Sequence, residues 1–288
     1  MMGDILMKLW KELTLILAVT IGVSGLAATH VQADTHTAFI NQMSQPVLKV
    51  SRQNHLYGSV MMAQAALESD WGTSQLSIDA HNYFGVKGNY DGHSITMSTA
   101  EANASGSMYN TLAQFKVYPS VKASLTDYAK TLRGGTTWNP FLYQGAWREN
   151  AGSYMAATAV VAENYATDQN YAEKLNNIIA EYDLHDLLDR STATSHDADT
   201  STEVTPGVDY SSYDGSATIK SGTIRFYNGV PTASDKVKSV KTTQLANKKV
   251  KVSARGIVTS DQSIWYQVKS GSVTGWVQIT DILGLKTN

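Results

Sequence analysis

The chain has 288 residues, of which 42% are hydrophobic and 17% charged, and its formal net charge is −2. This composition is typical of a globular protein with one or two domains and excludes a largely disordered chain. Cysteine is absent, which excludes a thiol nucleophile, a Cys-ligated zinc site and a disulfide framework.

The first 33 residues have the pattern of a signal peptide. Lys8 and Lys11 precede an apolar core over 13–23, and the small residue Ala33 stands just before Asp34. We therefore expect export and cleavage after Ala33, with no stable membrane insertion afterwards. The alternative interpretation is an uncleaved membrane anchor, since residues 13–33 carry no formal charge.

Charge divides the rest of the chain into three parts. Residues 34–190 carry ten Lys/Arg against fifteen Asp/Glu, 191–216 carry none against five, and 217–288 carry eleven against three. The middle part is rich in Ser, Thr and Asp and poor in apolar residues, which predicts a flexible linker between two domains. The basic last part favours a polyanion as partner, and an exported chain is not expected to bind nucleic acid.

Helical patterns dominate the first domain. Four stretches have apolar residues at helical spacing: 39–50, 60–71, 121–132 and 170–188. Pro46 is expected to break or kink the first helix, and Ser120 is a suitable N-cap for the third. Residues 95–99 and 113–117 alternate as two short strands with a turn at "ANASG". We therefore predict a mainly helical domain with a small β-lobe.

The last domain is rich in short β patterns. Four runs of β-branched and aromatic residues are separated by turns, at 223–228, 248–258, 264–270 and 274–279. Their regular spacing predicts a small all-β barrel. We therefore predict an α+β fold with two domains. The first, 34–190, is mainly helical with a small β-lobe, and the second, 217–288, is a small all-β barrel.

One carboxyl group, that of Glu68, is placed unusually. It falls in the last turn of the helix predicted over 60–71, where the helix carries partial negative charge. It shares a small, mostly apolar helix face with Met61, Gln64 and Ala65. Desolvation and the helix end both disfavour the charged form, so the pKa should rise, as a general acid requires. The alternative is a solvated surface glutamate.

Several ordered blocks of the first domain carry a resemblance to a known family. They are "AQAALESDWGTSQL" (63–76), "HNYFGVKG" (81–88), "TAE" (99–101), "AQFKVYPSVKASLTDYAKTL" (113–132), "NPFLYQGAW" (139–147) and "NYATDQNYAEKL" (164–175). Together they resemble the N-acetylglucosaminidases of glycoside hydrolase family 73, which cut bacterial peptidoglycan. The resemblance implies a lysozyme-like fold and an active cleft between the helical part and the β-lobe. It also implies endo cleavage of the β-1,4 bond between N-acetylglucosamine and N-acetylmuramic acid. We expect neither a cofactor nor a metal.

The same resemblance assigns three catalytic residues. Glu68 matches the family's essential general acid, and Glu101 matches a second glutamate that activates water or stabilises positive charge at the anomeric carbon. Tyr165 matches a cleft tyrosine that hydrogen-bonds the substrate's N-acetyl group or the developing charge. The sequence departs from the family pattern at Ala102 and Gln169, where tyrosine and proline are usual. The alternative for Glu101 is a solvated hairpin residue.

Other residues of these blocks are candidates for binding substrate, and each has a plain core role as its alternative. They are Phe84, Lys87, Trp138, Trp147 and Tyr171. Tyr171 is the weaker of the two tyrosine candidates, because a tyrosine at its position more often packs in a core. Spacing along the chain does not distinguish a retaining, an inverting or a substrate-assisted mechanism.

The segment "WYQVKSGSVTGWVQI" (265–279) resembles the bacterial SH3-like domains appended to wall hydrolases. The resemblance implies binding to the cell wall, with Trp265, Tyr266 and Trp276 as wall-binding candidates. The positive charge of this domain would also suit the phosphates of teichoic acids. The alternative is that these aromatic residues form the core of the barrel.

Taken together, the sequence predicts a secreted, wall-associated peptidoglycan hydrolase of the autolysin type, for a wall of the Gram-positive kind. Two alternatives remain open: a muramidase or lytic transglycosylase of lysozyme-like fold, and a non-catalytic wall-binding or adhesion protein. The seven histidines are scattered and no H-E-x-x-H motif occurs, which argues against a zinc peptidase or amidase.

Overall fold

The computed structural model describes residues 26–102, 108–166, 168–190, 207–233, 237–271 and 273–287, with residues 26–34, 100–102 and 108 described by their backbone alone. The chain divides into two compact units: the described part of the first is 46–189, and the second joins 26–45 to the residues from 190 onward. The predicted signal peptide up to residue 25 and the linker residues 191–206 lie outside the described residues. Among the helices of the described ranges, none is both long enough and apolar enough to span a membrane.

Helix α2 (Leu26–Gln53) contains Pro46 and continues through it, so the predicted break does not occur. A proline inside a helix removes one backbone hydrogen bond, a loss that the rest of the helix can outweigh. The predicted cleavage site after Ala33 lies within this helix. Residues up to Gln45 belong to the second unit, where the Asn41 side-chain amide donates to the Ile282 carbonyl at 2.5 Å.

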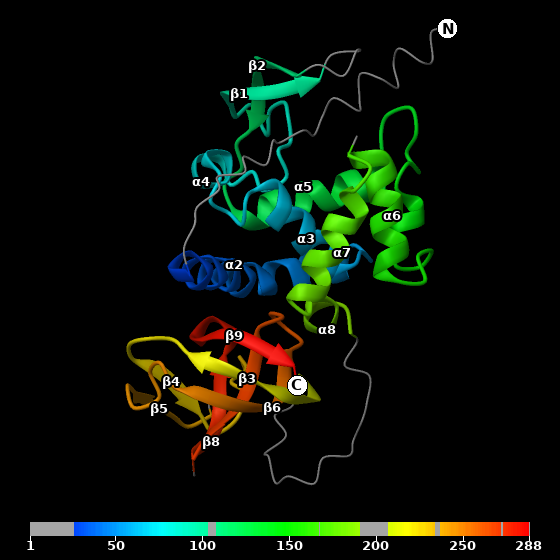
Figure 1. The fold of residues 1–288 in the computed structure, drawn as a ribbon. Helices are drawn as coiled ribbons and strands as arrows, with labels where there is room; N and C mark the ends of the chain where they lie inside the picture. The colour runs from blue at the N-terminus through cyan, green and yellow to red at the C-terminus, as the bar shows by residue number, and fades with distance from the viewer. Residues whose placement is uncertain are drawn as a thin grey trace, which may run out of the picture. The chain divides into compact units, whose positions relative to one another are not determined.

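The 3₁₀ turn η3 (Ile279–Asp281) belongs to the second unit, and the other remaining helices belong to the first (Figure 1). They are α3 (Gly58–Glu68), α4 (Gln75–Ala80), α5 (Val121–Gly134), the 3₁₀ turn η2 (Gln144–Ala146), α6 (Tyr154–Tyr165), α7 (Tyr171–Glu181) and α8 (Leu184–Leu188). Ten of the eleven residues of α3 are buried, so this helix forms the centre of the unit. The predictions of α3 and α5 are confirmed, and Ser120 caps α5 by accepting from the Ala123 N–H at 3.2 Å.

Two features of the helical part were not predicted. The last predicted helix is two helices, α7 and α8, because Asp183 between them takes a left-handed conformation with φ of 49°. Helices α4 and α6 were missed, although Ser74 and Ser153 cap them by accepting from the N–H groups of Ser77 and Ala156.

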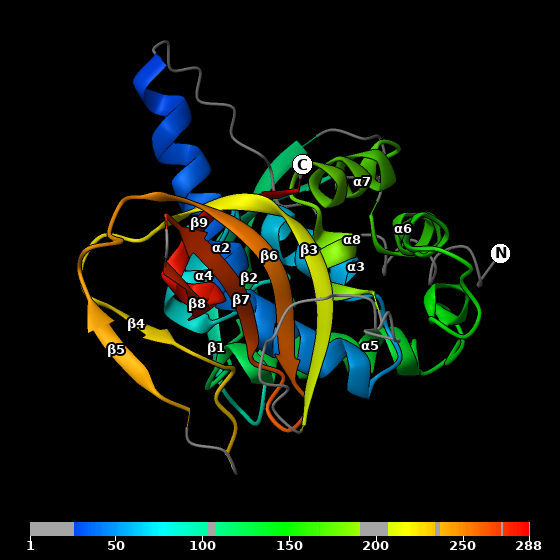
Figure 2. The same cartoon turned by 90° about the horizontal axis from the view of Figure 1, so that it is seen from below.

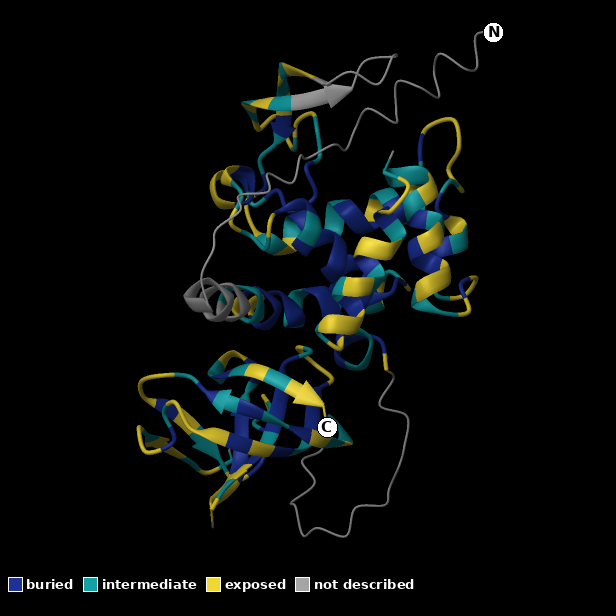
Figure 3. Ribbon diagram, viewed as in Figure 1, coloured by how far each residue is buried: buried dark blue, intermediate teal, exposed yellow. Residues whose placement is uncertain are grey.

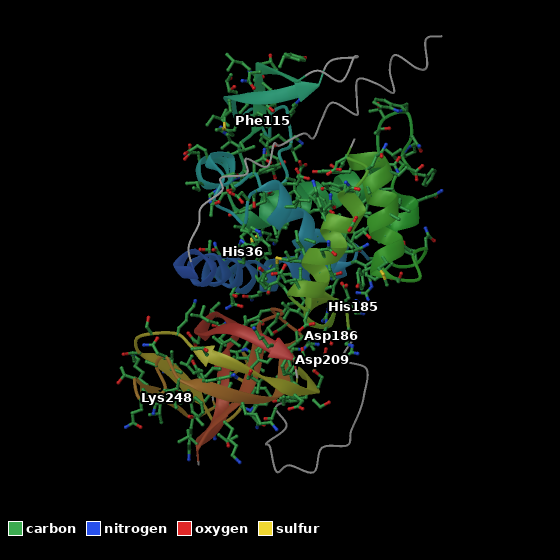
Figure 4. All side chains as sticks on the ribbon, in the orientation of Figure 1. His36, Phe115, His185, Asp186, Asp209 and Lys248 are labelled. Atoms are coloured by element: carbon green, nitrogen blue, oxygen red, sulfur yellow. The ribbon has the colours of Figure 1, made fainter. Side chains whose placement is uncertain are left out.

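The predicted β-lobe is confirmed as a two-stranded antiparallel ladder of β1 (Ser94–Ala102) and β2 (Met108–Lys116). Its base is buried: Phe115 of β2 packs with Leu76 and Ala80 of α4, and Figure 4 labels Phe115 at this end of the lobe. Farther along β2, Leu112 is 72% exposed and Tyr109 is 48% exposed. Among the described side chains, the hydrophobic cluster of the lobe thus lies at its base.

The second unit contains a seven-stranded antiparallel sheet in the order β5-β4-β8-β7-β6-β3-β9. Its strands are β3 (Val208–Ile219), β4 (Ile224–Tyr227), β5 (Ser239–Thr242), β6 (Lys249–Val258), β7 (Ile264–Ser270), β8 (Val273–Gln278) and β9 (Ile282–Thr287). Figure 2 shows β3, β6, β7 and β8 as neighbouring, curved strands. The four predicted β runs are confirmed as β4, β6, β7 and β8, whereas the SH3-like barrel stays a prediction.

The predicted linker is wrong over its last nine residues, 208–216, because they belong to strand β3. Their composition is polar, but β3 lies between β6 and β9 and pairs with both. Ladder hydrogen bonds on two sides satisfy the backbone of this strand, and its polar side chains alternate with better buried ones. Tertiary pairing therefore overrides the local composition.

The three residues predicted to bind the wall lie in the interior of the second unit, as the buried bands of the strands in Figure 3 illustrate. Trp265 is 8% exposed, Trp276 is 1% exposed and Tyr266 is fully buried. Trp265 and Trp276 pack in one cluster with Val230 and Val258. The prediction of direct wall contact through these side chains is therefore wrong, and the alternative, a structural core, is correct. Large aromatic rings gain more by burial than any other side chains in so small a sheet.

Candidate active site

Helix α3 ends at Glu68, and a tight turn fixes this end. Asp70, Trp71 and Gly72 all have positive φ, at 49°, 55° and 75°. The Trp71 N–H donates to the Ala66 carbonyl at 2.8 Å, and the Ser69 hydroxyl accepts from the Gly72 N–H at 2.8 Å. A left-handed tryptophan is unfavourable by itself, so the surrounding contacts must hold it, including the ring of Tyr182 at 4.9 Å. The turn stops the helix directly after its carboxyl-bearing residue.

The Glu68 carboxyl is buried at the end of a hydrogen-bonded network that joins α3 to α7 and α5. Only 6% of the residue is exposed. The Tyr171 hydroxyl, from α7, donates to Glu68 Oε1 at 2.5 Å. The Gln64 amide, one turn earlier on α3, donates to the same hydroxyl oxygen at 3.1 Å, and Tyr128 of α5 donates to the Gln64 carbonyl oxygen. The predicted shared face of Gln64 and Glu68 is thus confirmed by a common partner.

Burial raises the pKa of Glu68 from its usual 4.5 to about 7, and the hydrogen bond from Tyr171 works against this rise by stabilising the carboxylate. At neutral pH a large fraction of the molecules therefore carries a protonated Glu68. The alternative of a solvated surface glutamate is wrong, because α3 runs through the interior of its unit and brings its last side chain there.

The contacts of the two tyrosine candidates differ from their ranking in the sequence prediction. Tyr171, ranked second, contacts Glu68 directly. Tyr165, predicted as catalytic, donates its hydroxyl to the Phe84 carbonyl at 3.0 Å, and its ring stacks on that of Tyr171 with centroids 6.1 Å apart. The local sequence does not rank them, because both fall in one segment. The packing of α7 against α3 decides which hydroxyl reaches the carboxyl.

Phe84 is fully buried and stacks on Tyr128 with ring centroids 4.1 Å apart. Its side chain is therefore a core residue rather than part of a substrate surface, which corrects the prediction. Its contribution to the site is its backbone carbonyl, which holds Tyr165.

The segment after Phe84 joins the helical part to the lobe. The N–H of Gly88 donates to the Gln114 carbonyl at 2.9 Å, so the chain around the half-buried Lys87 pairs with β2. The buried Asn82 side chain holds this crossing by donating to the carbonyls of Val86 and Lys116, both at 2.9 Å, and by accepting from the Val86 N–H. Sequence reasoning missed Asn82; a polar residue before the apolar "YFGV" was the available signal.

The two tryptophan candidates differ in exposure. Trp147 is held in place: its indole N–H donates to the Leu132 carbonyl at 2.8 Å, and the Arg133 guanidinium lies 3.9 Å from its ring centroid. Trp138 is 51% exposed, and Phe141 in the same loop is 58% exposed. Trp138 therefore remains a candidate for stacking on sugar rings, with Phe141 beside it in sequence.

Glu101 lies in β1 opposite Tyr109, next to the last described pair of the ladder. Its side chain lies outside the described part of the structure, so its catalytic role stays a prediction. Strand alternation places position 101 on the same ladder face as Ile95 and Met97, whose side chains pack against the α4 cluster.

The chemistry available at this site is proton transfer. A carboxyl that is buried, partly protonated near neutral pH and held by a phenol has the properties of a general acid. Within the described ranges, no three His, Asp or Glu side chains gather in the way a metal site requires. The helical unit, its β-lobe and the helix-end carboxyl together define a glycoside hydrolase.

Comparisons with known proteins identify the family. Residues 44–184 match the glucosaminidase family model, described as mannosyl-glycoprotein endo-beta-N-acetylglucosaminidase. The exo-glucosaminidase LytG of Bacillus subtilis is 33% identical over 249 residues, which cover 85% of this chain and 81% of that protein. The catalytic domain of the autolysin Auto of Listeria monocytogenes is 43% identical, with a TM-score of 0.52, covering 58% of this chain and 99% of that domain. The chain therefore belongs to the glucosaminidase family, glycoside hydrolase family 73, and its predicted lysozyme-like catalytic fold is confirmed.

Other relatives match over the catalytic region. The autolysin of Enterococcus faecalis is 38% identical over 192 residues, which are 66% of this chain and 25% of that protein. A probable N-acetylmuramidase of Lactococcus lactis is 44% identical over 157 residues, or 36% of its length. The chain thus spans a quarter to about a third of the length of these two relatives. The name of the second relative indicates a muramidase rather than a glucosaminidase, and the name autolysin specifies no bond.

Proposed function

We propose that this protein is an exported endo-β-N-acetylglucosaminidase that cleaves the β-1,4 bond between N-acetylglucosamine and N-acetylmuramic acid in peptidoglycan. The observation that carries the proposal is the buried Glu68, whose pKa of about 7 allows it to protonate a glycosidic oxygen at neutral pH. The description of the matching family model supports the endo cleavage and the sugar.

Glu68 acts as general acid in every version of the mechanism. Glu101, from the β-lobe, activates water or stabilises the positive charge that develops at the anomeric carbon. Tyr171 holds the Glu68 carboxyl, Tyr165 supports the neighbouring wall of the site, and Trp138 stacks on a sugar ring of the glycan. The substrate acetamide offers a third route, since its oxygen can attack the anomeric carbon in place of a second carboxylate.

Product analysis on purified peptidoglycan tests the bond. The expected products are fragments with a new reducing end on N-acetylglucosamine. A reducing end on N-acetylmuramic acid would instead identify a muramidase, and an anhydro sugar a lytic transglycosylase. Release of single sugars from chain ends, without internal cuts, would identify an exo enzyme. A renaturing gel that contains cell walls separates all of these from a non-catalytic binding protein, which gives no cleared band.

For the second unit we infer binding to the anionic polymers of the wall, the teichoic acids. The ladder registers place one row of side chains across five neighbouring strands: Lys286, Ser216, Lys251, Lys269 and Thr274. All of them are exposed except Ser216, which is half-buried. Lys251 and Lys269 are directly opposite each other, an arrangement that is unfavourable for like charges. The exposed Asp214, 3.5 Å from the Lys251 ammonium, offsets only part of this charge. Phosphates along a polymer that crosses the strands would neutralise the row.

Neutralising the row tests this inference. We expect Lys251→Gln, Lys269→Gln and Lys286→Gln together to weaken retention on teichoic acid-bearing walls, and added salt to weaken retention of the unaltered protein. The matched control removes three charges from the β4–β5 hairpin, with Arg225→Gln, Lys238→Gln and Lys241→Gln. If both triple variants lose retention equally, net charge alone explains the binding. If the first triple variant loses no retention, the lysine row is not the binding site.

Export follows from the signal-peptide pattern of residues 1–33, and we infer a secreted, wall-associated protein of a Gram-positive type of cell. The mature protein should begin at Asp34. Sequencing the N-terminus of the protein recovered from culture medium and from walls tests this point. A protein that keeps residues 1–33 and fractionates with membranes would support the uncleaved anchor instead.

A further inference from the structure

A chain of three hydrogen bonds links three helices through the interior of the catalytic unit. Tyr128 of α5 donates to Gln64 Oε1, Gln64 Nε2 donates to the Tyr171 oxygen at 3.1 Å, and Tyr171 donates to Glu68 Oε1 at 2.5 Å. Tyr128, Gln64 and Tyr171 are each at most 4% exposed. Water therefore does not compete for these groups, and each hydroxyl takes its direction from protein partners.

The number of protons in the chain fixes its direction. A phenol has one O–H proton. Because the Gln64 amide already donates to the Tyr171 oxygen, the Tyr171 proton goes to Glu68. Tyr128 fixes the amide in turn, since its own proton goes to Gln64 Oε1. A reversed amide would present its oxygen to Tyr171 and compete with Glu68 for the Tyr171 proton.

This direction also determines which oxygen of Glu68 is the acid. Oε1 accepts the Tyr171 proton, so in the neutral carboxyl the acidic proton resides on Oε2. The other groups whose charges couple to Glu68 are phenols as well: Tyr165 of α6 and Tyr128 of α5. The Tyr171 bond is thus the specific contact that favours the carboxylate against burial.

We propose that Gln64 is a positioning residue for catalysis: its amide, held by Tyr128, directs the Tyr171 proton to Glu68 Oε1 and so keeps the transferable proton on Oε2. The inference rests on the proposed role of Glu68 as general acid. Gln64 itself does not need to touch the substrate, because it acts through Tyr171.

The test compares Gln64→Met with Tyr171→Phe. Methionine keeps the volume and helix preference of glutamine but has no amide. Tyr171→Phe removes the bond to the carboxylate, so we expect the basic limb of the pH–rate profile to move up by about one pH unit. Gln64→Met removes the N–H that polarises and orients the Tyr171 hydroxyl, so we expect a smaller shift in the same direction. The double variant should show no further shift, because Gln64 acts only through Tyr171. Tyr143→Phe, which removes another buried hydroxyl that donates to the Asn164 carbonyl, is the matched control without a shift.

A second readout does not depend on turnover. Titration of the Glu68 carboxyl by ¹³C NMR should show an upward shift in both variants, larger in Tyr171→Phe than in Gln64→Met. A Glu68 that titrates at the same pH in Gln64→Met as in the unaltered protein would overturn the proposal. If Gln64→Met does not fold, Tyr128→Phe releases the amide alone and should shift the titration in the same direction by a smaller amount; an unchanged titration there would overturn it too. Full activity of Glu68→Gln would instead defeat the proposed function while leaving the titration result intact.

Discussion

The two glutamates proposed for catalysis lie in different structural settings, one at the end of a buried helix and the other in a two-stranded β-lobe. Glu68 ends a helix that is buried almost throughout, and its carboxyl is held by a phenol from another helix. Glu101 lies near the outer end of a two-stranded ladder whose base packs through Phe115, Leu76 and Ala80. A proton donor with a tuned pKa needs a fixed, dry environment, whereas a group that meets the substrate from a hairpin can approach after binding. From this comparison we predict a rigid acid at Glu68 and a movable partner at Glu101.

The largest expected effect comes from Glu68→Gln. The amide keeps the size of the side chain and can still accept from Tyr171, but it has no acidic proton. We expect wall lysis to fall by about 10²–10⁴-fold, the usual contribution of general-acid catalysis. The turnover rate on purified walls measures this, with circular dichroism and wall binding as controls for the fold. Near-normal turnover in the folded variant would contradict the role of Glu68.

The same substitution should change the pH dependence of stability. The pKa of Glu68 is about 7 in the folded protein and near 4.5 when unfolded, so the folded state binds the proton more tightly. The stability that this proton confers is fully present below pH 4.5 and is lost as pH rises through about 7, by about 3 kcal/mol in total. Glu68→Gln lacks this loss. The free energy of unfolding, measured from pH 4 to pH 8, should therefore fall more steeply in the unaltered protein.

Glu101→Gln should cost less activity than Glu68→Gln, because water or the substrate acetamide can take over part of its role. Paired rate measurements on one wall preparation check the order of the two effects. A defect as severe as that of Glu68→Gln would argue for a fixed pair of carboxyls and against a movable lobe.

Hydrogen exchange tests the mobility itself. We expect the backbone amides of the outer ladder, near Glu101 and Tyr109, to exchange faster than those of α3, and a bound oligosaccharide to slow them. Isolated two-stranded hairpins are marginally stable, which is the physical basis of this expectation. Equal protection of the lobe and α3 without ligand would contradict it.

The smallest expected effect concerns the support of the lobe. Ser74 caps α4 by accepting from the Ser77 N–H at 3.2 Å, and α4 carries the residues against which Phe115 packs. Ser74→Ala should cost about 1 kcal/mol of stability. The control is Ser120→Ala, which removes an equivalent N-cap from α5. If the lobe depends on α4, only Ser74→Ala should speed exchange in β1 and β2.

Local sequence determined those features of this protein that follow from patterns of a few residues. The helical spacing gave α3 and α5, the Ser120 cap and the place of Glu68 at a helix end, and alternation gave the lobe and four strands of the second unit. The small, apolar face around Glu68 also predicted its raised pKa, since burial depends on the neighbours that a helix brings to one face.

Only the tertiary structure decided the partners of these groups. Tyr171 rather than Tyr165 meets Glu68, and Tyr128 and Gln64 complete the chain, because hydrogen bonds between helices depend on packing that no local pattern encodes. The sequence allowed either a wall-binding or a core role for Trp265 and Trp276, and their burial in the structure assigns them to the core. The polar residues of β3 form a strand because β6 and β9 supply hydrogen bonds from distant positions in the chain, and such long-range pairing overrides local preference.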